Sequence, residues 1–117
     1  MAPRPALVDS PLSLDRIVHG PLRLGIVVAL AAADRRSFTE LRDGLGATDG
    51  NLNASLQKLE QAGYVAASKK ADGRVAITEY QLTRAGQKAL ETYLEQFERI
   101  VGPARGRAAN QIGRAHV

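Results

Sequence analysis

The sequence predicts a mainly α-helical fold with one β-hairpin, and three observations lead to this expectation. Leucines recur at helical spacing in the stretch TDGNLNASLQKLEQAGYV, at Leu52, Leu56 and Leu59. Two β-prone stretches, YVAASKK and VAITEYQL, are joined by ADGR, and Asp-Gly is a strong hairpin signal. Apolar residues line one side of the segment 84–101. With 117 residues, the chain is long enough for a single domain with one modest core.

Three helices are expected ahead of the leucine-rich stretch. Ser13 can cap a short helix over 14–19, and a proline opens the next helix, 21–33. The second of these is apolar on nearly all sides, so we expect it at the centre of the core. A third, short helix, FTELRDGL, is capped by Ser37 or Thr39 and stops at one of two nearby glycines.

A helix-turn-helix is predicted in the middle of the chain. Its parts are a short helix over 39–45, the turn GAT, and a second helix over 49–62 that Thr48 caps and a glycine ends. A hairpin directly after the second helix makes this arrangement a winged helix, in which the hairpin loop can reach the DNA backbone or the minor groove. The predicted fold class is therefore mainly α with a β-hairpin wing, a winged helix-turn-helix followed by a long C-terminal dimerisation helix.

These segments resemble the small winged-helix transcriptional regulators related to the MarR and ArsR families. The similarity spans about residues 14–101. It is carried by the following residues: His19, Pro21, Arg23, Leu24, Phe38, Leu41, Gly50, Asn51, Leu52, Leu56, Leu59, Glu60, Gly63, Tyr64, Val65, Leu82, Thr83 and Gly86. The resemblance implies a dimeric repressor or activator. One departure is the stretch RVAITEY, where these families have a more basic stretch that contains proline.

The outer face of the predicted helix 49–62 is rich in amides rather than charges. Asn and Gln can donate and accept together, which matches the edge of adenine in the major groove, while Lys58 can reach guanine or a phosphate. The alternative is a solvated polar face that has few charges by chance. We expect DNA contacts from this helix at Thr48, Gly50, Asn51, Asn53, Ala54, Gln57 and Lys58.

The wing, 64–82, carries three cations near its tip. Lys69, Lys70 and Arg74 can neutralise phosphates, and each such contact makes binding more dependent on salt. The alternative is charge that keeps an edge strand soluble.

The last predicted helix, 84–101, is capped by Thr83 and has a seam like that of a coiled coil. It is longer than so small a core needs, so we expect it to pair with a second copy of the chain. The alternative is packing onto its own domain. The expected dimerisation residues are Leu90, Tyr93, Leu94, Phe97 and Val101.

The composition argues against several other functions. The chain has no cysteine, which excludes disulfides and thiolate metal sites within it and fits a cytoplasmic location. His19, between an apolar segment and Gly-Pro, is interpreted as a helix-end or packing residue. There is no Gly-rich phosphate loop and no His-rich metal spacing, so we expect neither catalysis nor a metal or cofactor. The apolar run 24–33 falls short of the length that a membrane span needs.

Both ends of the chain are expected to lie outside the domain. Residues 1–12 are rich in proline and read as a flexible leader, and 102–117 read as a disordered tail. The codons ATC GGA AGA GCA CAC GTC would encode 112–117 and match a widely used sequencing adapter, so we interpret these residues as adapter read-through; the alternative is a natural tail that matches by chance. The net charge is +4 and the pI about 9.9, but without the arginines of the tail the chain is nearly neutral.

The leading hypothesis is a dimeric, sequence-specific transcriptional regulator that binds double-stranded DNA, with repression as the expected mode. Helix 49–62 would lie in the major groove and the wing on the backbone or in the minor groove. The alternative is a winged-helix module for protein–protein interaction without base-specific DNA binding, which the near-neutral charge favours. A small-molecule effector between the DNA-binding unit and the last helix is left open.

Overall fold

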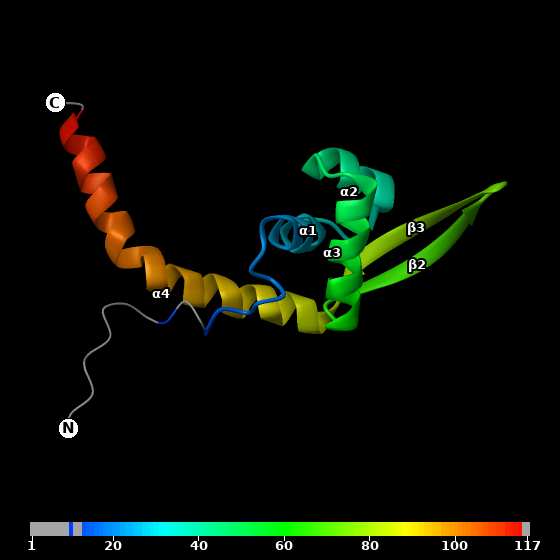
Figure 1. The fold of residues 1–117 in the computed structure, drawn as a ribbon, viewed down its shortest axis with the longest axis horizontal. Helices are drawn as coiled ribbons and strands as arrows, with labels where there is room; N and C mark the ends of the chain where they lie inside the picture. The colour runs from blue at the N-terminus through cyan, green and yellow to red at the C-terminus, as the bar shows by residue number, and fades with distance from the viewer. Residues whose placement is uncertain (1–9, 11–12, 116–117) are drawn as a thin grey trace, which may run out of the picture.

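Four helices and a three-stranded antiparallel sheet form within the part of the chain that the computed structural model describes. That part is residues 10 and 13–115, with side chains for all of them except 72 and 107–115. The elements are α1 (Pro21–Ala31), β1 (Arg36–Ser37), α2 (Phe38–Leu45), α3 (Asp49–Gln61), β2 (Val65–Asp72), β3 (Val75–Leu82) and α4 (Arg84–Ala115). Figure 1 shows α4 running past one end of α3, while the hairpin of β2 and β3 projects away from the helices. The predicted winged helix-turn-helix with a long C-terminal helix is confirmed, and the role of that helix in dimerisation stays a prediction.

The predicted helix over 14–19 is wrong, because this segment is a tight turn. The carboxylate oxygen Oδ1 of Asp15 accepts the N–H groups of Ile17 at 2.8 Å and Val18 at 3.2 Å. The N–H of His19 donates to the carbonyl of Asp15 at 2.8 Å. An aspartate that bonds the backbone just after itself offers the chain an alternative to a helical ladder. The predicted leader, 1–12, lies outside the described residues apart from residue 10.

α1 begins at Pro21, as predicted, but it is not buried on all sides. Ile26, Val27 and Leu30 are buried, whereas Val28 is 48% exposed. The helix ends at Ala31, two residues before the expected end. α1 is therefore more apolar than its packing in the core of the domain requires.

The helix-turn-helix forms from local capping signals. Ser37, rather than Thr39, caps α2, and its hydroxyl and the Glu40 carboxylate make a reciprocal capping box. Gly46 ends α2 in the left-handed region at φ 64°, where glycine is favoured. Thr48 then caps α3 by accepting the N–H of Asn51 at 3.2 Å.

The sheet has the order β1-β3-β2. β2 and β3 pair over their whole length, from Val65 opposite Leu82 to residue 72 opposite Val75. Gly73 opens the two-residue loop at φ 64°, a position where hairpin loops of this length favour glycine. β1, which the sequence does not predict, pairs with β3 only at Tyr80 and Glu79. The outer part of the hairpin is thus a two-stranded ribbon.

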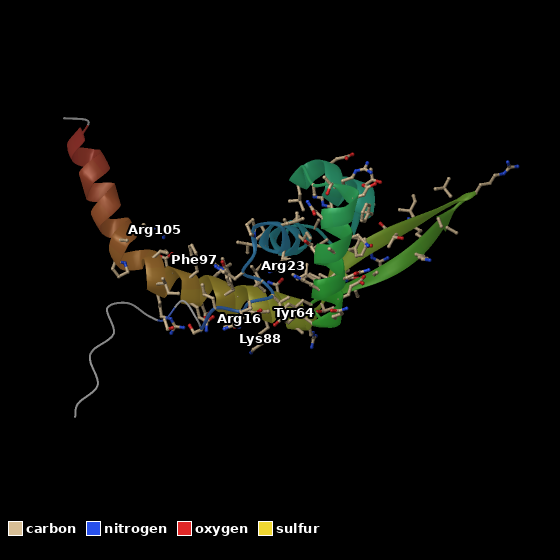
Figure 2. The ribbon with its side chains drawn as sticks, viewed as in Figure 1. Arg16, Arg23, Tyr64, Lys88, Phe97 and Arg105 are labelled. Carbon is tan, nitrogen blue, oxygen red and sulfur yellow. The ribbon has the colours of Figure 1, made fainter. Side chains whose placement is uncertain are left out.

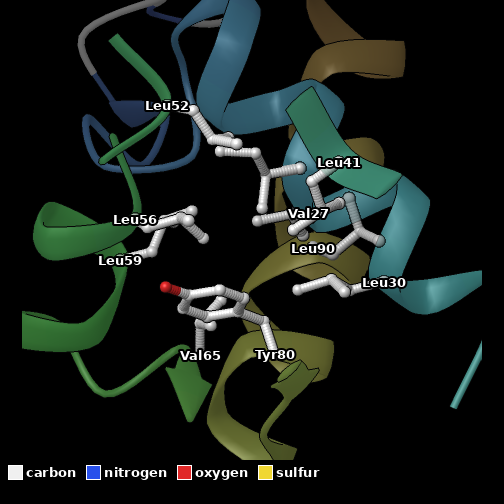
Figure 3. Packing of buried hydrophobic residues seen from close by; sticks show 10 residues of the cluster. Val27, Leu30, Leu41, Leu52, Leu56, Leu59, Val65, Tyr80 and Leu90 are labelled. Atoms are coloured by element: carbon white, nitrogen blue, oxygen red, sulfur yellow. The ribbon is translucent and has the colours of Figure 1, made fainter. Parts of the chain in front are cut away.

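Two groups of buried apolar residues hold these elements together. The main core, drawn in Figure 3, joins α1, α2, α3, the sheet and α4: Ile26, Val27, Leu30, Leu41, Leu52, Leu56, Leu59, Val65, Tyr80 and Leu90. A smaller cluster of Leu14, Val18 and Tyr93 fastens the segment 13–20 to α4. Tyr64 packs against both groups.

α4 begins where predicted, but it continues past the predicted end at 101 into the predicted disordered tail, 102–117, of which 116 and 117 lie outside the described residues. The helix continues to Ala115 with Pro103 inside it, and it changes direction in its orange part in Figure 1. Proline removes one hydrogen bond of the helical ladder, which bends a helix without always ending it. Arg105 donates to both carboxylate oxygens of Glu98, at 2.7 and 2.9 Å. This contact links the helical turns on the two sides of Pro103. The origin of 112–117 as adapter read-through stays a prediction.

Candidate nucleic-acid interface

α3 has one buried face and one polar face. Leu52, Leu56 and Leu59 are at most 1% exposed and face the core (Figure 3). The residues predicted to contact DNA are all exposed: Thr48, Gly50, Asn51, Asn53, Ala54, Gln57 and Lys58. The arrangement leaves amide donors and acceptors free along the side of α3 that faces away from the core, which is the chemistry needed to read base edges.

The N-terminal end of α3 is capped by Thr48 and open to a large partner. The Thr48 hydroxyl accepts the Asn51 N–H, yet its own hydrogen can still be donated to a phosphate. A Cβ added at Gly50 would meet nothing within 4 Å, so another molecule can approach the backbone closely there.

Sequence reasoning missed an ion pair that ties α2 to the first residue of α3. The guanidinium of Arg42 donates to Asp49 and to Asp43, each at 3.0 Å. These hydrogen bonds raise the pKa of Arg42, and the one to Asp49 has the larger effect. Because the pair depends on the angle between two helices, spacing along the chain gives no signal for it.

The wing presents its cations in different directions. Lys69 pairs with Thr78 and lies on the face of the hairpin that includes Val65 and Tyr80, which pack against α3. Lys70 is opposite Ile77 and lies on the other face. Arg74 is in the two-residue loop at the tip and is exposed. The three residues therefore do not form one cluster.

The residues predicted to dimerise fall into two groups. Leu90 and Tyr93 are buried in the domain's own clusters, 5% and 3% exposed. Leu94 and Phe97 are 51% and 40% exposed, and Val101 is half-buried. Figure 2 shows Phe97 on α4, before the bend near Arg105. We call Leu94, Phe97 and Val101 the free seam of α4.

Other kinds of site find no support in the described part of the chain. Within it, no group of His, Asp and Glu side chains could hold a metal ion, and no helix is apolar enough over a sufficient length to cross a membrane. His19 shares a hydrogen bond of 2.8 Å between its Nδ1 and the hydroxyl of Tyr93, and the two rings pack at 5.7 Å. This contact joins the segment 13–20 to α4.

Comparison with known proteins agrees with this geometry. The family model for the winged helix DNA-binding domain matches residues 22–101. An uncharacterized protein of Methanocaldococcus jannaschii is 34% identical over 83 residues, which cover 70% of this chain and 89% of that protein. The structure of a transcriptional regulator homologue from Pyrococcus horikoshii is similar with a TM-score of 0.72 and 26% identity, covering 77% of this chain and 89% of the other.

A regulator of the MarR family from Enterococcus faecalis shares the fold, with a TM-score of 0.68 and 21% identity over 80% of this chain and 84% of its own. The similarity thus includes the helix-turn-helix, the wing and the first part of α4. The chain therefore belongs to the winged helix DNA-binding domain family.

Proposed function

We propose that the protein is a homodimeric repressor that binds a specific operator in double-stranded DNA. The observation that carries this proposal is the polar face of α3, where exposed Gln57 lies on the side away from the fully buried leucines, with Asn51 and Asn53 on its two flanks. In this proposal α3 enters the major groove, Asn51, Asn53 and Gln57 hydrogen-bond base edges, and the Ala54 methyl can contact a thymine methyl. Repression follows when the bound protein occupies promoter DNA.

The wing supplies backbone contacts in this proposal. The hairpin projects from the domain beside α3 (Figure 1), so its tip can reach the DNA backbone or the minor groove next to the groove that α3 occupies. Lys58, Lys69 and Arg74 are exposed cations that can neutralise phosphates. Such contacts position the protein without reading sequence.

The free seam of α4 supports the homodimer. Two large apolar side chains, Leu94 and Phe97, are about half exposed on a helix that is 32 residues long. Pairing of two such seams would bury them and place two α3 helices on the half-sites of one operator.

The test is selection of bound duplexes from random DNA, followed by a salt titration of binding to the selected sequence and to scrambled DNA. The proposal predicts sequence-preferring binding whose affinity falls steeply with salt. Gln57→Ala is expected to lower the preference between the selected and altered bases by about tenfold. Gln87→Ala, an exposed glutamine on α4, is the matched control and should change nothing.

Binding without sequence preference, or no salt-dependent binding, would contradict the proposal. The second result would favour the alternative, a winged helix that binds another protein. A reporter gene under the upstream region of the protein's own gene tests the direction of regulation, and higher expression in the absence of the protein is the expected result.

A further inference from the structure

The end of α3 is locked into a specific turn. The helix closes with a Schellman motif, in which the N–H of Gly63 donates to the carbonyl of Glu60 and the N–H of Tyr64 to that of Leu59, both at 2.9 Å. Gly63 has φ 80°, which favours glycine. The position of Tyr64 is therefore fixed relative to the last turn of α3.

This turn is seated directly on the first turn of α4. Thr83 donates its N–H to the Tyr64 carbonyl at 3.0 Å and its hydroxyl to the Gly63 carbonyl at 2.6 Å. The same hydroxyl accepts the N–H of Gly86 at 3.0 Å. A Cβ at Gly86 would collide with the Tyr64 carbonyl oxygen, so the two backbones touch. These contacts form a pivot between α3 and α4.

The Tyr64 side chain adds a second attachment away from this pivot. Its hydroxyl donates to Oδ2 of Asp15, whose other carboxylate oxygen caps the turn 15–18. Arg23 of α1 holds the same turn by donating to the carbonyl of Ile17 at 2.7 Å. Figure 2 shows Tyr64 close to this segment and to α4.

The turn is itself attached to α4. Leu14 and Val18 pack against Tyr93 in the smaller apolar cluster. The path from α3 through Tyr64 and Asp15 thus returns to α4 by a route that is separate from the Thr83 contacts. Two separate attachments fix an angle, whereas a single pivot allows rotation.

We propose that Tyr64 is a positioning residue, whose hydrogen bond to Asp15 sets the orientation of α3 relative to α4 and thereby the half-site spacing that the protein accepts. The inference rests on the homodimer proposed above, because α4 would then carry the dimer axis. Asn51 and Asn53, two of the residues proposed to contact bases, lie toward the opposite end of a 13-residue helix from Tyr64, so a small rotation at the pivot displaces them appreciably. Insertion of one base pair rotates one half-site against the other by about 34°.

A first experiment measures the orientation without DNA or dimer contacts. The chain has no cysteine, so Asn53→Cys on α3 and Glu91→Cys on α4 can carry two spin labels in one protomer. Diluted with unlabelled protein, the parent should give a narrow distribution of label distances. Adding Tyr64→Phe, which deletes only the hydroxyl, should shift or broaden it, whereas Tyr80→Phe, which deletes a hydroxyl in the main core and outside the contacts between the segment 13–20 and α4, should not. An unchanged distribution in Tyr64→Phe would overturn the proposal.

A second experiment measures spacing on duplexes that carry two copies of the selected half-site, with base pairs inserted or removed between them. We expect the wild type to lose about tenfold in affinity per misplaced base pair. Tyr64→Phe should bind a single half-site as the wild type does but lose less than about threefold on misplaced sites. Asp15→Asn should behave in the same way, and the double variant should add nothing to either single one.

If Tyr64→Phe lost affinity by the same factor at every half-site spacing, Tyr64 would have only a structural role, and the inference would be overturned. A wild type without any spacing preference would overturn the dimer and this consequence of it. In that case the label distances still report on the orientation of α3, so the two failures are distinguishable.

Discussion

Lys69 and Lys70 are adjacent in the chain but lie on opposite faces of the wing. The face of Lys69 continues the one that packs on α3, whereas Lys70 lies on the face turned away from α3, so we expect Lys69 to lie nearer to DNA bound by α3. We therefore predict that Lys69→Ala weakens binding to all sequences and lowers the slope of log affinity against log salt by about 0.9. Lys70→Ala is the matched control, with a smaller change in slope. Equal slopes for the two variants, measured by salt titration, would contradict this assignment.

Tyr64 gives a prediction for alkaline stability. The hydrogen bond to Asp15, together with burial, raises the pKa of Tyr64 to about 12. The pKa of an unfolded tyrosine is about 10, so folding favours the neutral hydroxyl. Its contribution to stability is complete below about pH 10 and is lost as the pH rises through about 12.

Denaturant unfolding at pH 9 and pH 11 should therefore show a larger loss of stability for the wild type than for Tyr64→Phe, because the variant has no hydroxyl to ionise at that position. The other tyrosines ionise in both proteins and serve as the internal control. Equal losses would mean that the bond to Asp15 does not stabilise the fold.

α3 contains a glycine that costs stability without an evident packing reason. A Cβ at Gly50 would meet nothing within 4 Å, and glycine in a helix is less favourable than alanine by up to about 1 kcal/mol. We predict that Gly50→Ala raises the free energy of unfolding but weakens binding to the selected DNA, because a methyl group keeps the backbone away from the groove. Gly44→Ala in α2, where a Cβ also meets nothing, should stabilise the protein without changing DNA affinity. Unchanged or tighter binding of DNA by Gly50→Ala would show that the Gly50 backbone does not closely approach the DNA.

The helix-turn-helix and the hairpin could be predicted because their signals are local. Caps such as Thr48, the leucine spacing of α3 and the Asp-Gly turn each act within a few residues. β1 escaped prediction because two residues form a strand only through pairing with β3, which follows much later in the chain. The turn at 14–19 escaped because the Asp15 carboxylate competes with the helical ladder.

The candidate site shows the same division between local and long-range information. Helical periodicity predicts the polar face of α3, and its exposure is confirmed. The opposite directions of Lys69 and Lys70 follow from strand alternation, which grouping by charge alone ignores. The contacts of Arg42 and Tyr64 depend on how distant elements pack, so neither could be read from spacing.

The oligomeric state concerns the whole molecule. If the free seam of α4 pairs two copies, a charge there should separate them, because burying an unpaired carboxylate is strongly unfavourable. We predict that Phe97→Glu is monomeric by sedimentation velocity and binds two half-sites no better than one. Thr92→Glu adds the same charge at another exposed position of α4 and should remain dimeric. A wild type that sediments as a monomer at high concentration would refute the pairing itself.

The wing extends beyond the point where β1 stops pairing with β3, and its outer part has no third strand. Isolated two-stranded ribbons are only marginally stable in water, so we expect this part to open and close while the core stays folded, and its amides to exchange hydrogen faster than those of α3. Holding the ribbon still against DNA has an entropic cost that falls on each encounter alike. In the proposed complex the wing would thereby shorten the time that the protein stays bound to any sequence, and α3 would supply the difference in affinity between the operator and other sites.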